Sequence, residues 1–161
     1  MKLMTKTALV GAGLLIAYSA QAALLATHTR NANYTYAEGT TPFVPLNDAG
    51  ATTITFNTGV RNQKVIVSYT AECGIIDNKN DTWVNIDIQV DGVAIRPTNN
   101  TSDAFCSSTN NAGYNWNMSA VNAVYIVPNP GVHTVRIRAA VQSGNGGATG
   151  WLGDTSLVVW R

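Results

Sequence analysis

The chain has 161 residues, and only 12% of them are charged, with ten Lys and Arg against nine Asp and Glu. An average globular protein carries about 25% charged residues, so this surface must take its polarity from Asn, Thr, Ser and Gly instead. The balance leaves no basic patch for nucleic acid, and it is typical of exported β proteins.

Residues 1–22 have the pattern of a secretory signal peptide. Lys2 and Lys6 precede a short apolar run, and the segment ends on the small-residue motif Ala-Gln-Ala. The run is too short to cross a membrane, which takes about 20 residues, so we expect no membrane span. We expect a mature chain over residues 23–161 that forms one domain and is secreted, periplasmic or held at the cell surface.

Apolar residues recur at every second position through most of this chain, which predicts an all-β fold. The clearest turn is Asp91-Gly92, because a two-residue type I′ turn needs positive φ at both positions. Many short strands with alternating faces predict a two-sheet antiparallel sandwich of jelly-roll type. The expected strands are 24–29, 32–37, 52–57, 63–73, 82–90, 93–96, 118–127, 132–142 and 155–160.

The chain has two cysteines, Cys73 and Cys106, and Cys106 anchors an expected long polar loop over residues 97–115. An even number of cysteines in an exported chain predicts one disulfide. Closing a loop of about 34 residues is worth at most about 3.8 kcal/mol in the chain-entropy model. A metal or thiol site would need partners at ligand spacing, and neither His28 nor His133 is near in sequence.

The stretch 82–90 alternates polar and aliphatic side chains. If it forms a hairpin with 63–73, core must face core, and Thr70 and Glu72 come to lie beside Asp87. An aromatic ring with short polar side chains is what a sugar-binding surface requires, whereas the alternative is an ordinary solvent-exposed sheet face. The candidate ligand-binding residues are Trp83, Asn85, Asp87, Gln89, Thr70 and Glu72.

Signs of catalysis are weak in this chain. Glu72 and Asp87 could form the carboxylate pair of a glycosidase, but an open strand face lacks the cleft that raises the pKa of one carboxyl group. His133 lies in line with Val and Ile, as a core residue does, so we expect no catalytic residue and no cofactor. Calcium at the turn with Asp77 and Asp81 is an alternative, although a simple hairpin turn explains these residues without an ion.

Five segments carry a resemblance to known proteins, over about residues 52–160: QKVIVSYTAEC, TWVNIDIQVDG, AFCSS, GVHTVRIRAAV and GWLGDTSLVVW. They resemble small exported bacterial jelly-roll proteins that are distantly similar to the tumour necrosis factor-like sandwich. The resemblance implies this fold and self-association, often as a trimer, and transfers no catalytic residue. The chain is also similar to chaperone–usher pilins, which end on a strand with a penultimate aromatic, here Trp160, but carry their first cysteine nearer the mature N terminus than Cys73.

Together these features predict an exported, non-catalytic recognition module that binds a glycan or another cell-surface ligand. One alternative is a structural subunit of a pilus-like filament or a homo-oligomer, because the strand that ends at Trp160 must pair within a sheet or with another chain. A second alternative is a glycan-active enzyme that uses Glu72.

Overall fold

The computed structural model describes residues 22–76, 82–95, 103–108, 116–143 and 146–161. Strands are the only regular elements in these residues, which confirms the all-β prediction. Their bounds are β1 (Leu24–Arg30), β2 (Tyr34–Ala37), β3 (Ile54–Thr58), β4 (Gln63–Ile76), β5 (Thr82–Val90), β6 (Val93–Ala94), β7 (Cys106–Ser108), β8 (Asn117–Val127), β9 (Gly131–Ser143) and β10 (Thr149–Trp160).

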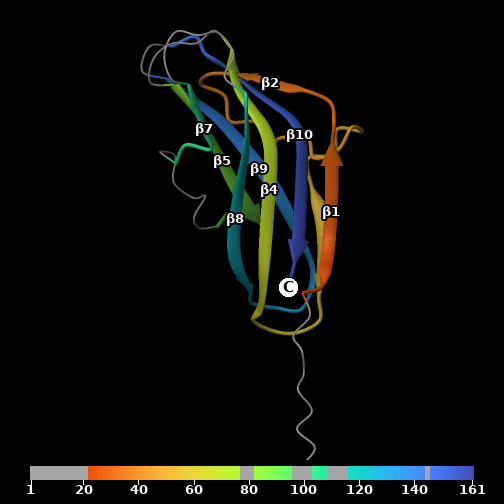
Figure 1. Cartoon of the computed structure of the whole chain (residues 1–161). Coiled ribbons are helices and arrows are strands. Elements are labelled where there is room, and N and C mark those ends of the chain that lie inside the picture. Colours follow the sequence, from red (N-terminus) through yellow and green to blue (C-terminus); the bar gives the residue numbers. More distant parts are fainter. Residues whose placement is uncertain (1–21, 77–81, 96–102, 109–115, 144–145) are drawn as a thin grey trace, which may run out of the picture.

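The strands form two antiparallel sheets that pack against each other (Figure 1). The first, called sheet A here, has the order β1-β10-β4-β8, and β2 pairs with one end of β10. The second, sheet B, has the order β3-β9-β5-β6, and β7 pairs with β5. The outer face of a sheet means, below, the face turned away from the other sheet.

Most successive strands cross from one sheet to the other. β3 belongs to sheet B, β4 to sheet A, β5 to sheet B, β8 to sheet A, β9 to sheet B and β10 to sheet A. This alternation is the jelly-roll arrangement, in which hydrogen-bonded neighbours are distant in sequence. The prediction of a two-sheet antiparallel jelly roll is therefore confirmed.

The predicted hairpin between 63–73 and 82–90 is wrong. β4 pairs with β10 and β8 in sheet A, whereas β5 pairs with β9 in sheet B. Apolar alternation fixes which face of a strand is buried, and both arrangements satisfy it, so the pattern alone cannot choose the partner. Thr70 and Glu72 consequently lie in a different sheet from Asp87.

The core fills the space between the sheets with side chains from alternate strand positions. Tyr69 on β4 and Ile88 on β5 are fully buried in it, as the alternation predicts. His133 faces the same interior, with 8% exposure and its ring centroid 5.5 Å from that of Phe56. The interpretation of His133 as a core residue is confirmed.

The turn between β5 and β6 has the predicted type I′ geometry, with φ of 51° at Asp91 and 80° at Gly92. The Asp91 carboxylate accepts a hydrogen bond from the backbone N–H of Thr134 at 2.8 Å and contacts Nδ1 of His133 at 2.7 Å. These two contacts hold the turn against β9, the strand next to β5.

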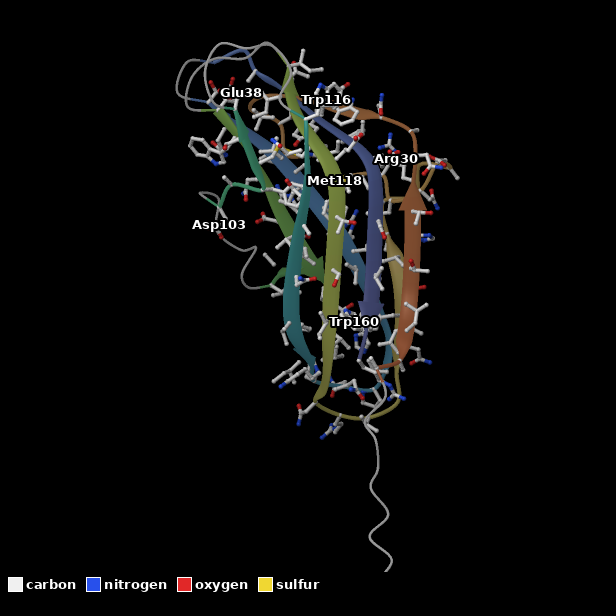
Figure 2. The ribbon with its side chains drawn as sticks, viewed as in Figure 1. Arg30, Glu38, Asp103, Trp116, Met118 and Trp160 are labelled. Carbon is white, nitrogen blue, oxygen red and sulfur yellow. A yellow bond between two sulfur atoms is a disulfide. The ribbon has the colours of Figure 1, made fainter. Side chains whose placement is uncertain are left out.

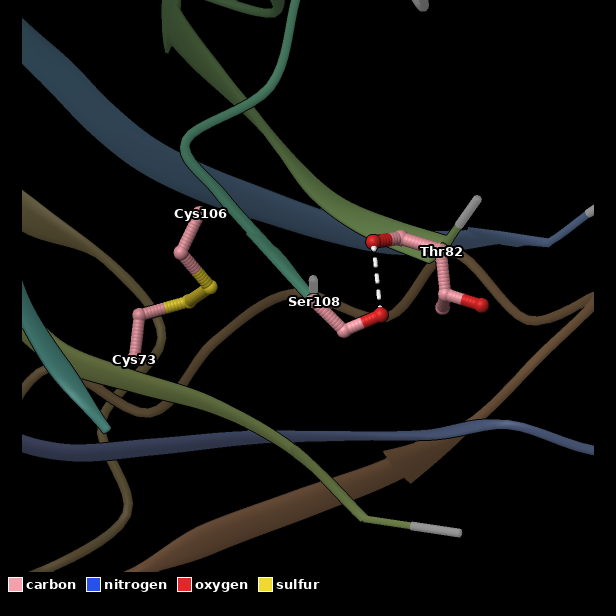
Figure 3. The surroundings of a disulfide bond; sticks show 4 residues. All are labelled: Cys73, Thr82, Cys106 and Ser108. Atoms are coloured by element: carbon pink, nitrogen blue, oxygen red, sulfur yellow. Dashed lines mark hydrogen bonds between the residues drawn. A yellow bond between two sulfur atoms is a disulfide. The ribbon is translucent and has the colours of Figure 1, made fainter. Parts of the chain in front are cut away.

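Cys73 and Cys106 form the predicted disulfide, which joins β4 of sheet A to β7 of sheet B (Figure 3). Cys106 was expected in a loop, but it begins a short strand and pairs with Val84 of β5. The Ser108 hydroxyl also donates to the carbonyl oxygen of Thr82 at 3.4 Å, across the same pair of strands. The disulfide therefore ties both sheets together at one end of the sandwich.

Candidate functional site

The candidate site lies on the outer face of sheet B, where β5 and β9 run side by side. The register places Asp87 of β5 opposite Arg138 of β9. On the other side of β9, the segment 41–44 continues the sheet, and Phe43 forms a β-bridge with Arg138. Three stretches that are distant in sequence thus meet on one face.

A pocket of about 130 Å³ opens where these stretches meet. It is lined by Thr41, Asn85, Asp87, Arg138, Ala139, Ala140 and Gln142. The lining brings together a carboxylate, a guanidinium, two side-chain amides and a hydroxyl. A small number of polar groups converging on one hollow is the usual composition of a site that orients a small ligand.

Ala140 is the reason that a hollow exists here. On β9 it lies between Arg138 and Gln142, the neighbours on the same face, and it pairs with Asn85 across the strands. Residues two apart on a strand point to the same side, so the long side chains form walls and the Ala140 methyl group forms the floor. A larger side chain at position 140 would fill the space.

Two hydrogen-bond acceptors of this pocket lack a donor. Asn85 is only 2% exposed, and within the described part of the chain neither its Oδ1 nor the buried Oδ1 of Asp87 has a hydrogen-bond partner. Buried polar atoms are almost always satisfied, and one left without a partner costs about 1–3 kcal/mol. These oxygens can therefore accept hydrogen bonds from a molecule, solvent or ligand, that enters the pocket.

Arg138 leans away from these acceptors. Its guanidinium donates to Oγ1 of Thr41 at 2.6 Å and lies 5.9 Å from the ring centroid of Phe43. Both contacts belong to the 41–44 segment, on the side of β9 opposite to β5. Asp87 and Arg138 therefore form opposite walls of the pocket, with the space between them open.

Burial raises the pKa of Asp87 above the ordinary 3.8, against the opposing charge of Arg138 and with a further contribution from the like charge of Asp103. The carboxylate is partly desolvated, and its ionised form is less favourable than in water. Hydrogen bonds from a ligand would stabilise that ionised form. They would contribute more here than at a fully exposed carboxylate, because water already solvates an exposed one.

The pocket continues into a longer groove. A second hollow of about 250 Å³, lined in part by Glu38, shares Thr41, Ala140 and Gln142 with the first. A third of about 300 Å³ lies between Glu38 and residues 146–149, next to the second. Ligand sites are usually about 300–1,000 Å³, so the first pocket suits one small group and the groove suits a longer molecule.

The structure brings only part of the predicted site together. Asn85 and Asp87 line the pocket, while Trp83 and Gln89 lie on the same face at either end, outside its lining. Trp83 is half-buried, and its Nε1 is buried without a hydrogen-bond partner among the described residues. Gln89 is 8% exposed and pairs in register with Arg136.

Thr70 and Glu72 lie on the outer face of sheet A and contribute nothing to this pocket. Their neighbours on β8 are Ala120 and Met118. The carboxylate pair of Glu72 and Asp87, considered as an alternative, is therefore not assembled, because the two groups are on opposite sides of the sandwich.

The pocket residues that the sequence analysis missed are Thr41, Arg138, Ala139, Ala140 and Gln142. The alternation in β9 does place Arg138, Ala140 and Gln142 on the polar face, and this signal would have sufficed had β9 been recognised as the neighbour of β5. No sequence signal points to Thr41, which comes from a segment between strands.

The described residues contain no group of three His, Cys, Asp or Glu side chains that could hold a metal ion. The calcium alternative at Asp77 and Asp81 falls outside the described residues, as does the expected signal segment as far as residue 21. Across the described ranges, no helix has the length and apolar character needed to cross a membrane.

Comparisons of this chain with protein-family profiles, with curated proteins and with solved structures found no match.

Proposed function

We propose that this protein is an exported, non-catalytic binding protein and that the pocket between Asp87 and Arg138 receives one sugar residue of a glycan. The observation that carries the proposal is the pair of buried acceptors at the pocket, Oδ1 of Asn85 and Oδ1 of Asp87, which have no hydrogen-bond partner among the described residues. A ligand for this site must bring hydrogen-bond donors, and adjacent sugar hydroxyl groups bring two.

Charge favours a neutral hydroxyl-rich ligand over an amine. An ammonium group would also donate to Asp87, but Arg138 in the opposite wall would repel it. A sugar hydroxyl is both donor and acceptor, so it can donate to Asp87 and accept from Arg138 or Gln142. The adjoining hollow at Glu38 offers room for further residues of an oligosaccharide.

The arrangement supports binding better than hydrolysis. Glycoside hydrolysis uses two carboxyl groups on either side of the scissile bond, about 5 to 9.5 Å apart. The described lining of this pocket contains one carboxyl group, that of Asp87, which faces a guanidinium, and the neighbouring carboxyl groups of Glu38 and Asp103 lie outside this lining.

The test is a glycan array probed with the purified protein, with Asp87→Ala and with Glu72→Ala. We expect Asp87→Ala to lose at least about tenfold in affinity, because a hydrogen bond to a charged group is worth about 1.5–3 kcal/mol. Glu72→Ala is the matched control, since it removes the same kind of charge from the outer face of the other sheet.

Equal binding by the parent protein and Asp87→Ala would place the site elsewhere, and loss of binding only in Glu72→Ala would place it on sheet A. Release of reducing sugar from a bound glycan, lost in Asp87→Ala, would show an enzyme instead.

A further inference from the structure

Strand β8 forms the border of sheet A (Figure 1). Among the described residues it pairs with β4 on one side and with no strand on the other. Its pairing with β4 runs without interruption from Asn117 to Val127. A long border strand with an uninterrupted register presents a row of backbone N–H and C=O groups that can pair with another chain.

Most proteins protect such an edge with charges, prolines, bulges or short strands. β8 has none of these, since its sequence NMSAVNAVYIV contains no charged residue and no proline. The opposite border of sheet A is different, because β1 ends on Arg30 and has a register shift between Leu24 and Ala26. In sheet B, β6 and β7 are only two and three residues long.

The outer face of β8 is also apolar at both ends. Met118 is 67% exposed, Val124 52% and Ile126 54%. Met118 follows the exposed Trp116 near one end of the strand (Figure 2). On the inner side, Val121 and Tyr125 are only partly covered by the core. Exposed apolar side chains on the outer face of an unpaired edge, with partly buried ones on its inner face, mark a surface for association.

We propose that β8 pairs with β8 of a second copy of this chain, antiparallel and about a two-fold axis at Asn122. In this register Met118 lies opposite Ile126 of the second copy, and Ala120 lies opposite Val124 of the second copy. Every apolar residue of the outer face then meets another, and the edge hydrogen bonds are satisfied.

The charges next to β8 favour the antiparallel direction. Lys64 of β4 lies beside Ile126, and Glu72 of β4 lies beside Met118. An antiparallel dimer therefore puts Lys64 of one copy and Glu72 of the other in one row, whereas a parallel dimer aligns like charges. Their separation of three strand spacings, about 14 Å, exceeds the screening length of about 8 Å at physiological salt, so this preference for the antiparallel direction is small there and grows as the salt concentration is lowered.

The β8 edge is separate from the proposed sugar site, which lies on the outer face of sheet B. Each copy contributes one strand, so the interface is small and we expect a weak dimer, with a dissociation constant roughly in the micromolar range. A dimer would carry two glycan sites, and two sites on one particle raise the effective affinity for a surface that displays many ligands.

Cysteine cross-linking tests the register directly. In the proposed dimer the two copies of residue 122 face each other at about 4.5–5.5 Å between Cα atoms, within disulfide reach. We expect mild oxidation to convert Asn122→Cys to a covalent dimer. Met118→Cys is the control, because its two copies are about 27 Å apart along the strand. Equal cross-linking of the two variants, or none in Asn122→Cys, would overturn the register.

Sedimentation velocity on a concentration series tests the surface itself. We expect Val124→Lys to weaken the dimer strongly, because it places a charge in the apolar contact, opposite Ala120 of the second copy. Val132→Lys makes the same substitution at a 71% exposed valine of sheet B and should leave the dimer intact. A parent protein that stays monomeric at hundreds of micromolar, or a dimer as strong in Val124→Lys as in the parent, would contradict the proposal.

Discussion

Asp87 in β5 and Asp91 in the turn that follows β5 have pKa values shifted in opposite directions. Asp87 lies on the outer face of β5, and burial raises its pKa above 3.8. Asp91 lies in the next turn, where burial also acts to raise the pKa, but hydrogen bonds with His133 and Thr134 outweigh it and the net pKa is lowered. Folding therefore disfavours the ionised form of Asp87 and favours that of Asp91.

We expect Asp87→Asn to be more stable than the parent at neutral pH. Its free energy of unfolding should be higher by up to about 1 kcal/mol, a small value because the carboxylate is partly exposed. A raised folded-state pKa means that the parent is penalised once Asp87 ionises, and this penalty vanishes below about pH 4. Urea unfolding at several pH values measures the difference, with Glu72→Gln as the control. A gain in stability together with lost glycan binding would mark Asp87 as a site residue, and a loss of stability would refute this reading.

Asp91→Asn should have the opposite effect. Its lowered folded-state pKa contributes stability that is present above about pH 4 and is lost as the pH falls through the folded value. The ring nitrogens of His133 contact Oδ2 of Asp91 at 2.7 Å and the carbonyl oxygen of Asn129 at 3.0 Å, so the Asp91 carboxylate belongs to a network that holds the turn against β9. We expect a loss of about 1 kcal/mol at neutral pH, because the carboxylate is partly exposed.

Thermal unfolding from about pH 2.5 to 7 measures this effect. Asp154→Asn is the matched control, as an exposed aspartate that also has positive φ. An Asp91→Asn variant with the same pH profile as the parent would show that this turn contributes no stability through its charge.

At the scale of elements, β10 shows what local sequence cannot reveal. The strand was expected at 155–160, but it begins at Thr149 and includes Gly150 and Gly153. Glycine has low β-propensity, so the run reads as a loop. The reason for Gly150 lies elsewhere in the fold, because a Cβ there would come within 2.5 Å of the Tyr36 ring and of Val141.

Gly150→Ala should therefore destabilise the sandwich. The added methyl group overpacks the core between Tyr36 and Val141, and such changes typically cost about 1–3 kcal/mol. Gly59→Ala is the control, since its Cβ would have no atom within 4 Å and its backbone is not in the positive-φ region. Equal free energies of unfolding for the two variants would refute this account of the β10 glycines.

The disulfide connects two elements, β4 of sheet A and β7 of sheet B. Breaking it releases a loop of about 34 residues in the unfolded chain, and the loss is at most about 3.8 kcal/mol. We expect reduction to lower the thermal midpoint by on the order of 10 °C. The Cys73→Ala/Cys106→Ala variant should show the lower midpoint with or without reductant. An unchanged midpoint with both thiols shown to be free would contradict this prediction.

At the scale of the whole molecule, apolar alternation predicted most strands, the buried face of each and the jelly-roll class. It could not identify β9 as the neighbour of β5, because pairing in this fold joins strands that are distant in sequence. Asn85 and Asp87 were therefore found on the correct strand, while Arg138 and Gln142 in the facing wall were missed. The hollow itself depends on Ala140, whose role is visible only once its neighbours are known.

The proposed sugar site lies on the outer face of sheet B, between Asp87 and Arg138. The most direct measurement is a titration of the isotope-labelled protein with oligosaccharides, followed by NMR. We expect the side-chain amide signals of Asn85 and Gln142 to shift in a saturable manner, while the backbone signals of Thr70 and Glu72 stay in place. Shifts confined to sheet A, or saturable binding that leaves Asn85 and Gln142 unchanged, would contradict it.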